Sequence, residues 1–203
     1  MLYINCAVGY SKNTNKRSKP DCDRLVLNDS GKLPLQTNVD NKYIEFIKFR
    51  NISKNNKGVA ICLAYNPKLG ECNKFDRTNQ KISNYLKSNN YAGYILLNFY
   101  SLLSTNARSL NTLGLSVDQY GIATTIIENT TYPIFLCYGK NHIVALKNSM
   151  LKKTLESEYG RNRDIYFSID KNNQFVHVGC RCCGGIYMPN FIKFNATVNL
   201  SVF

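Results

Sequence analysis

Two asparagines stand directly after apolar runs of the sequence. Asn66 follows the run 59–65 (VAICLAY), and Asn98 follows the run 94–97 (YILL). An asparagine side chain carries both a carbonyl acceptor and an amide donor, so one residue can bind the hydrogen-bonding edge of a nucleobase. The alternative role is local, because asparagine often ends strands and forms Asx-turns. With two asparagines at the same end of one predicted sheet, both interpretations stay open.

Aromatic side chains accompany the asparagines and could stack on a base through their ring faces. These aromatic residues are Tyr65, Phe75, Phe99, Tyr100 and Tyr138. Asp76 also follows Asn66 along the chain, and its carboxylate could act as a general base. Its place immediately before a helical pattern favours a second role, that of an N-cap.

Several classes of catalytic site are excluded by the residues at hand. With His142 and His177 as the two histidines of the chain, no Ser-His-Asp arrangement is recognisable, and no Gly-rich phosphate-binding loop is present. No cofactor is expected.

One cysteine cluster could bind a metal ion. Cys180, Cys182 and Cys183 have the spacing C-x-C-C, which differs from a zinc knuckle, and no second Cys/His pair stands at the usual distance. The start of the chain shows no secretory signal, so thiols in a cytoplasmic protein are the favoured interpretation and a metal site is the alternative. Cys62 and Cys137 lie in apolar runs and are expected to be buried.

The elements that must position these residues alternate along the chain. Apolar runs predict four central strands, and helical patterns lie between them; the strands are expected at 59–65, 94–97, 132–137 and 164–169, and the helices at 76–89, 116–129 and 141–159. A capping box at 116–119 is expected to open the second helix. The segments RLVL and YIEFIKF between residues 24 and 50 suggest a pair of strands near the edge of the sheet.

This alternation predicts a three-layer α/β fold, with a mostly parallel sheet of about four central strands and helices on both faces. The 203 residues are expected to form a single domain. In such a sheet, ligands bind beyond the carboxyl ends of the strands.

The net charge of +13 favours a phosphate-rich partner, and DNA is the expected one. Residues 10–23 are expected to form a basic loop or arm that could bind a phosphate backbone, although a solvated loop without a partner is the more common explanation of such a segment. The alternative explanation of the charge is compositional, because abundant lysine and asparagine are typical of an AT-rich genome. No apolar run approaches the ~18 residues of a membrane span, so no membrane partner is expected; a protein partner is left open.

The order of four segments resembles the uracil-DNA glycosylase superfamily, in particular its mismatch-specific (thymine/uracil) branch. The segments are LAYNP (63–67), ILLNFYSL (95–102), IFLCYGK (134–140) and a late proline-containing loop. The chain resembles more closely an uncharacterised bacterial and phage family, in which Asn-Pro is followed by Asp-x-Thr (here 76–78), an Asn-Leu-Phe-like step, Trp-Gly and a late Gly-x-Pro-x-His-Pro. The resemblance places a glycosylase-like core at 58–192.

The resemblance implies roles for individual residues. Asn66 would position the attacking water, Asn98 would bind the Watson–Crick edge of a flipped base, and Tyr138-Gly139 takes the place of Trp-Gly. Together with the aromatic Phe75 and Phe99, the residues expected at the base or the nucleic acid are Pro67, Met188, Pro189 and Asn190. Met188 stands where the uncharacterised family has histidine, and methionine cannot donate a hydrogen bond to a developing oxyanion.

The leading hypothesis is a DNA-binding protein of uracil-DNA glycosylase-like fold that recognises or excises an extruded base. A non-catalytic DNA- or protein-binding module on the same fold is the first alternative, and a nucleotide or modified-nucleoside enzyme is the second. The sequence leaves open whether the protein is an enzyme.

Overall fold

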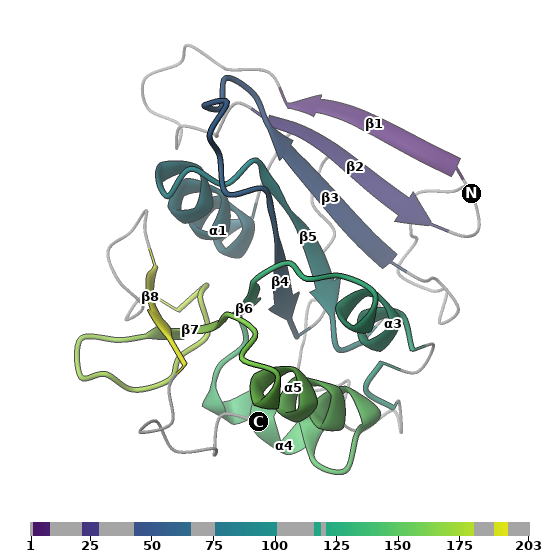
Figure 1. The fold of residues 1–203 in the computed structure, drawn as a ribbon, viewed down its shortest axis with the longest axis vertical. Coiled ribbons are helices and arrows are strands. Elements are labelled where there is room, and N and C mark those ends of the chain that lie inside the picture. Colours follow the sequence, from purple (N-terminus) through teal and green to yellow (C-terminus); the bar gives the residue numbers. More distant parts are fainter. Residues whose placement is uncertain are drawn as a thin grey trace.

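The computed structural model of the chain describes residues 2–8, 22–28, 43–65, 76–100, 116–118, 121–180 and 189–194. Within these residues eight strands form one sheet in the order β1-β2-β3-β5-β4-β6-β7-β8 (Figure 1). The strands are β1 (Leu2–Val8), β2 (Cys22–Asn28), β3 (Tyr43–Phe49), β4 (Val59–Ala64), β5 (Gly93–Asn98), β6 (Ile134–Leu136), β7 (Ile165–Ile169) and β8 (Asn190–Lys193). Most of the predicted basic arm, 10–21, lies outside the described residues.

The sheet is mixed, so the prediction of a mostly parallel sheet is wrong. Strands β5, β4, β6 and β7 are parallel to one another and are the four central strands that the apolar runs predict. Strands β1, β2 and β3 continue the sheet beyond β5 by antiparallel pairing, and β8 pairs antiparallel with β7 at the other edge. The expected strand pair between residues 24 and 50 is present as β2 and β3.

Strand β4 is buried on both faces because its side chains alternate between two apolar clusters. Ile61 and Leu63 belong to one cluster, and Ala60 and Cys62 to the other. Continuous apolar runs such as β4 are typical of parallel strands that helices cover on both sides.

The helices cover both faces of the sheet. Helix α1 (Arg77–Ser88) places Ile82 and Leu86 in the cluster that contains Cys62. Three further helices of the described residues cover the other face: α3 (Ile122–Glu128), α4 (Ile143–Leu146) and α5 (Met150–Gly160). They contribute Ile127, Leu146 and Leu155, respectively, to the other cluster. A short 3₁₀ helix, η1 (Lys140–His142), precedes α4. No helix of the described residues is both long and apolar enough to span a bilayer.

Capping side chains fix where the helices begin. Asp76 is the N-cap of α1, and its Oδ1 accepts a hydrogen bond from the backbone N–H of Asn79 at 2.8 Å, as the sequence predicts. The helix expected from residue 116 begins only at Ile122. The reason is Asp118, whose carboxylate accepts from the N–H groups of Ala123 and Thr124 and so caps the chain further along.

The long helix expected at 141–159 is interrupted between α4 and α5. Asn148 has a positive φ of 66°, which an α-helix does not allow. Ser149 then opens α5, because its hydroxyl donates to the carbonyl of Leu146 at 2.7 Å and accepts from the N–H of Lys152 at 3.1 Å. One serine thus ends one helix and begins the next.

Cys62 and Cys137 are free thiols with no solvent exposure, as the sequence predicts. They come from neighbouring parallel segments, because the N–H of Cys137 donates to the carbonyl of Leu63 beside Cys62. Burial, together with the contact between the two thiols, raises the pKa of Cys62 well above its ordinary value. Both therefore act as small apolar side chains in the core.

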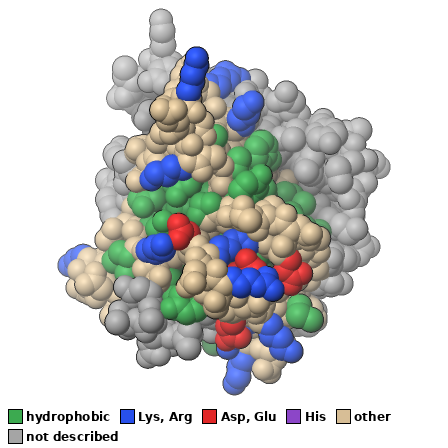
Figure 2. Space-filling model, viewed as in Figure 1, with side chains coloured by type: hydrophobic (Ala, Val, Ile, Leu, Met, Phe, Trp, Pro, Cys, Tyr) green, Lys and Arg blue, Asp and Glu red, His purple; other side chains and the backbone are tan. Residues whose placement is uncertain are grey.

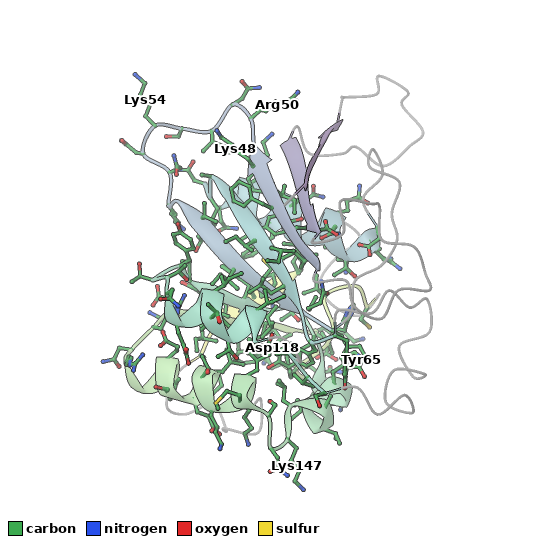
Figure 3. All side chains as sticks on the ribbon, turned by 90° about the vertical axis from the view of Figure 1, so that its right-hand side faces the viewer. Lys48, Arg50, Lys54, Tyr65, Asp118 and Lys147 are labelled. Atoms are coloured by element: carbon green, nitrogen blue, oxygen red, sulfur yellow. The ribbon has the colours of Figure 1, made fainter. Side chains whose placement is uncertain are left out.

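Basic side chains lie at the end of the sheet where β3 ends and β4 begins. Figure 2 shows Lys and Arg side chains toward the top of the view without Asp or Glu beside them, whereas lower in the view Lys and Arg lie among the Asp and Glu side chains. Figure 3 places Lys48, Arg50 and Lys54 at this end of the molecule, and Tyr65 and Lys147 toward the other.

Arg163 ties together α3, α5 and the segment that enters β6. Its guanidinium donates to the carbonyl oxygens of Ile127 (2.5 Å) and Tyr132 (2.8 Å). It also donates to Oγ1 of Thr130 at 3.1 Å and forms an ion pair with Glu158 at 2.8 Å. The side chains of Arg163 and Glu158 are only 6% and 9% exposed, so their charges are poorly solvated and depend on each other.

We expect Arg163→Ala to lower the free energy of unfolding by about 3 kcal/mol or more, because it removes the buried partner of Glu158. Arg161→Ala is the matched control, since Arg161 pairs with the same carboxylate but its side chain is 69% exposed. An exposed pair contributes about 1 kcal/mol or less. Urea denaturation measures both variants, and equal effects would contradict a special role for Arg163.

Candidate functional site

The carboxyl ends of the central strands meet at one edge of the sheet, called the carboxyl edge below. Ala64, the last residue of β4, pairs in register with Asn98, the last residue of β5. The pairing continues beyond the strands, because the N–H of Tyr100 donates to the carbonyl of Tyr65 at 3.2 Å. Asn98 therefore lies beside the segment that leads into Asn66. The predicted site residues Asn66, Pro67, Phe75 and Met188 themselves lie outside the described residues.

The amide group of the Asn98 side chain is buried at this edge and has no partner among the described residues. Its Oδ1 and Nδ2 atoms are both inaccessible to solvent, and neither forms a hydrogen bond within the described part of the chain. A buried polar group without a partner costs about 1–3 kcal/mol, so most such groups in native proteins are paired. An amide that is left unpaired at the ligand-binding edge of an α/β sheet is suited to bind a ligand.

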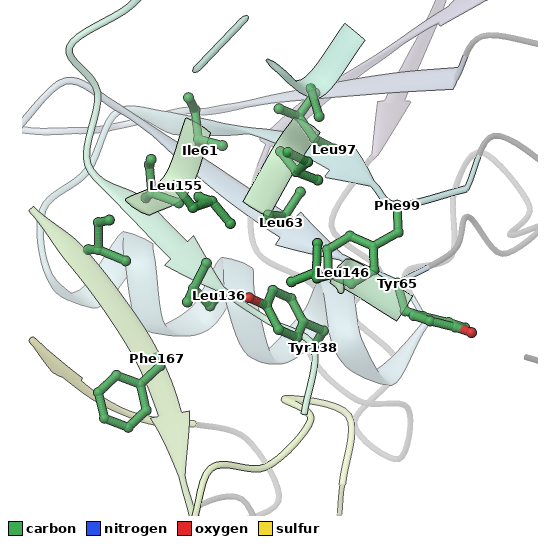
Figure 4. Close-up of a cluster of buried hydrophobic side chains, with 14 of the residues drawn as sticks. Ile61, Leu63, Tyr65, Leu97, Phe99, Leu136, Tyr138, Leu146, Leu155 and Phe167 are labelled. Carbon is green, nitrogen blue, oxygen red and sulfur yellow. The ribbon is translucent and has the colours of Figure 1, made fainter. Parts of the chain in front are cut away.

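The aromatic residues expected to stack on a base are buried against one another. Phe99 and Tyr138 have ring centroids 4.6 Å apart, and the ring centroids of Tyr65 and Tyr100 are 5.2 Å apart. All four are 5% exposed or less. Figure 4 shows Phe99, Tyr138 and Tyr65 with the apolar cluster that contains Ile61 and Leu63. In this structure the four rings are packed into the core at the carboxyl edge.

The remaining described site residues lie at the same edge. Gly139 follows β6 and is buried. Asn190 is exposed and pairs with Ile169, the last residue of β7, and Pro189 just before it is buried. The carboxyl edge thus brings Asn98, Tyr138, Gly139, Pro189 and Asn190 to the ends of β5, β6 and β7.

Two histidines meet at the carboxyl edge, although no role was predicted for them. The rings of His142 and His177 have centroids 5.7 Å apart, and the ring of Tyr65 stacks on His142 at 4.0 Å. Their meeting depends on Gly139, where a Cβ atom would overlap the backbone nitrogen of His177. Each histidine follows a central strand by a few residues, so the strand-end rule that selected the asparagines would also have selected the histidines.

The hydrogen bonds of both histidines define which ring nitrogen carries the proton. Nδ1 of His142 accepts from the N–H of Gly139 at 3.3 Å, and Nδ1 of His177 accepts from the N–H of Gly179 at 2.9 Å. In the neutral ring the proton is then on Nε2. Each neutral imidazole can therefore donate one hydrogen bond from Nε2–H.

Burial keeps both histidines neutral. It lowers the pKa of His142 to about 4, and the nearby ring of His177 contributes to the same shift. Burial also lowers the pKa of His177 to about 4, with a second contribution from the positive charge of Lys81. Both imidazoles at this edge are therefore neutral at physiological pH.

Lys81 connects helix α1 to the segment after His177. Its side chain has no solvent exposure, and Nζ donates to the carbonyl of Cys180 at 2.9 Å. Cys180 is disulfide-bonded, so the prediction of a free thiol is wrong for this residue. The predicted cluster partners Cys182 and Cys183 lie outside the described residues.

The carboxylates of Asp76 and Asp118 are both used to cap helices. Asp76, the candidate general base, is thus also the N-cap of α1, which is the role that its sequence position favours. Within the described residues, no three His, Cys, Asp or Glu side chains converge as they would around a metal ion.

The chain was compared with known protein families, curated proteins and solved structures. Residues 48–177, well over half of the chain, match a family described as "Protein of unknown function (DUF1643)". This confirms the expectation of an uncharacterised family, whereas the resemblance to uracil-DNA glycosylases stays a prediction. No curated protein and no solved structure matches the chain.

The lowered histidine pKa values predict how stability depends on pH. In the unfolded chain the histidines titrate near 6.5 and in the folded chain near 4, so between these values the unfolded chain binds more protons. The free energy of unfolding should therefore fall as the pH is lowered from about 6.5 toward 4, and above that window these histidines should cause no change.

The double variant His142→Asn, His177→Asn provides the comparison, because the asparagine oxygen can replace the Nδ1 acceptor without titrating. Its free energy of unfolding, measured by denaturant titration at several pH values, should depend less on pH between about 6.5 and 5 than that of the wild type. The same pH dependence in both proteins would show that the histidines are not buried as neutral rings.

Proposed function

The chain belongs to the DUF1643 family, whose description assigns no function, and from its carboxyl edge we propose that it is a DNA-binding protein that binds an extruded base. The observation that carries the proposal is the buried amide of Asn98, which has no hydrogen-bond partner in the part of the chain that the structure describes. Excision of the bound base is the enzymatic form of the proposal.

The amide of Asn98 fits a nucleobase better than it fits a simple ion. It offers an acceptor, Oδ1, and a donor, Nδ2, side by side and in one plane, and both are unpaired among the described residues. A base edge presents donors and acceptors at the same spacing, so one side chain can make two hydrogen bonds to it. A phosphate or carboxylate oxygen could satisfy only the Nδ2 half of the amide.

The neutral histidines lie at the same edge of the sheet as the amide and could supply further donors to a bound base. The Nε2–H groups of His142 and His177 can donate to a carbonyl oxygen of a base, such as those of uracil and thymine. If the bond from sugar to base breaks, these donors can stabilise the negative charge that develops on the base. They would thus serve in place of the histidine that the late loop lacks at Met188.

A base of duplex DNA can reach Asn98 and the histidines only after it has left the base stack of the duplex. Extrusion costs a few kcal/mol, and the cost is smallest at a mispaired or damaged position. The proposal therefore favours binding to mispaired DNA over fully matched DNA. The overall charge of +13 supports affinity for DNA in general.

A non-catalytic module on the same fold is the second candidate, and the use of the carboxylates favours it. Asp76 and Asp118 both accept hydrogen bonds from helix N–H groups, and activating a water would compete with that role. The aromatic ring faces are also inaccessible to a stacking base, because Phe99 and Tyr138 are almost fully buried. Binding without excision requires neither a general base nor an open ring face.

Substitution of Asn98 tests base recognition directly. Asn98→Ala should lower the preference for a duplex with uracil, thymine or hypoxanthine opposite guanine by about tenfold or more relative to a matched duplex, because a bidentate contact is worth about 1–3 kcal/mol. Asn98→Asp keeps the size and replaces the donor by an acceptor, so it should change which base is preferred. Fluorescence anisotropy with labelled duplexes measures both effects.

Asn129→Ala is the matched control, because Asn129 is exposed and lies at the end of α3 before β6 begins, away from the carboxyl edge. Single-turnover base release from the same duplexes separates the two candidates. Release by the wild type that Asn98→Ala abolishes would identify an enzyme, and mispair preference without release would identify the binding module. A wild type that does not distinguish mispaired from matched DNA would refute the proposal.

A further inference from the structure

The loop between β3 and β4, residues 50–58, is a basic surface at the end of the sheet opposite the carboxyl edge. Its sequence RNISKNNKG contains three cations and no acidic residue, and Lys48 precedes it at the end of β3. Lys48, Arg50, Lys54 and Lys57 are all exposed. Figure 3 shows Lys48, Arg50 and Lys54 far from Tyr65 at the carboxyl edge.

The lysines of this surface keep their positive charge available to a partner. The ion pairs found in the described part of the chain involve other cations, and none includes Lys48, Lys54 or Lys57. Glu45, on the same strand as Lys48, is 1% exposed and so is withdrawn from the surface.

The loop is held in one conformation by hydrogen bonds to the turn that follows α1. Nδ2 of Asn90 donates to the carbonyl of Asn55 at 3.0 Å, and the N–H of Lys57 donates to the carbonyl of Asn90 at 2.8 Å. The ammonium of Lys57 lies 5.4 Å from the ring centre of Tyr91. The cations of the loop are thus presented from a fixed backbone, which reduces the entropic cost of binding.

We propose that this basic loop, together with Lys48, binds the phosphate backbone of a nucleic acid. Exposed Asn51, Ser53 and Asn55 stand between its cations, and such neutral side chains commonly contact phosphate and sugar oxygens beside Lys and Arg. An anionic membrane is a poorer fit, because binding to it also uses exposed apolar side chains. The apolar residue of the loop, Ile52, packs against the core instead.

This surface is separate from the base-binding site of the proposed function. The two lie at opposite ends of β5, whose six residues at about 3.3 Å each span about 20 Å. A nucleic acid that contacts both must therefore run along the molecule, and its backbone would be held at a distance from the extruded base. The loop can also bind nucleic acid if Asn98 binds none.

The triple variant Lys48→Gln, Lys54→Gln, Lys57→Gln tests the inference in the full-length chain. The slope of log affinity against log salt concentration for a labelled duplex should become shallower by about 0.9 for each phosphate that the variant no longer neutralises. Lys147→Gln, Lys153→Gln, Lys171→Gln is the control with the same change in charge at exposed positions on α5 and in turns outside the loop. It should leave the slope close to that of the wild type.

Equal changes in the two triple variants would overturn the inference, since net charge alone would then explain binding. Tighter binding of the wild type to phosphatidylserine vesicles than to DNA, weakened only in the loop variant, would also overturn it. Thermal melting shows that each variant is folded. Asn98→Ala should keep the wild-type salt slope, so failure of the loop inference and failure of base recognition give different results.

Discussion

Strand β4 pairs with parallel strands on both of its edges, and the arrangement of the whole molecule depends on this pairing. A strand in that position has no edge free for water and both faces covered, so its side chains must be small or apolar, as Ala60, Ile61, Cys62 and Leu63 are. The parallel direction also brings the carboxyl ends of β5, β4 and β6 to the same edge. The polar groups of the candidate site come from the segments that leave the core there.

A second constraint acts between loops. The chain after β6 and the chain after β7 approach so closely at Gly139 that no side chain fits between them. The N–H of Val178 donates to the carbonyl of Cys137 and fixes this approach. Close packing brings two imidazoles together and withdraws them from water, which is why they remain neutral. The geometry of the site and its electrostatics thus have one cause.

The central strands and the first helix could be predicted because their signals are local. A continuous apolar run marks β4, and Asp76 before a helical pattern marks the start of α1. The mixed character of the sheet could not be predicted, because it arises when β3 and β8 pair antiparallel with strands distant in the sequence. The hydrophobic pattern within a strand does not indicate which distant strand it will pair with.

The same distinction holds for the candidate site. Asn98 is recognisable because it directly ends an apolar run, although only the structure shows that its amide has no partner among the described residues. The meeting of His142 with His177 depends on a glycine contact between two loops, and spacing along the chain does not reveal it. The break before α5 was also missed, since the bonds of Ser149 to Leu146 and Lys152 replace a helical turn that the apolar pattern alone would continue.

The buried thiols of Cys62 and Cys137 make it possible to measure how often the core of the native protein opens. Alkylating reagents react with thiolates that they can reach, and here burial both blocks access and raises the pKa of Cys62. Modification of either thiol in the native protein requires the centre of the sheet to open. The rate at which the peptides containing them gain mass would therefore follow the opening of the most protected part of the fold, separately from fraying at its edges.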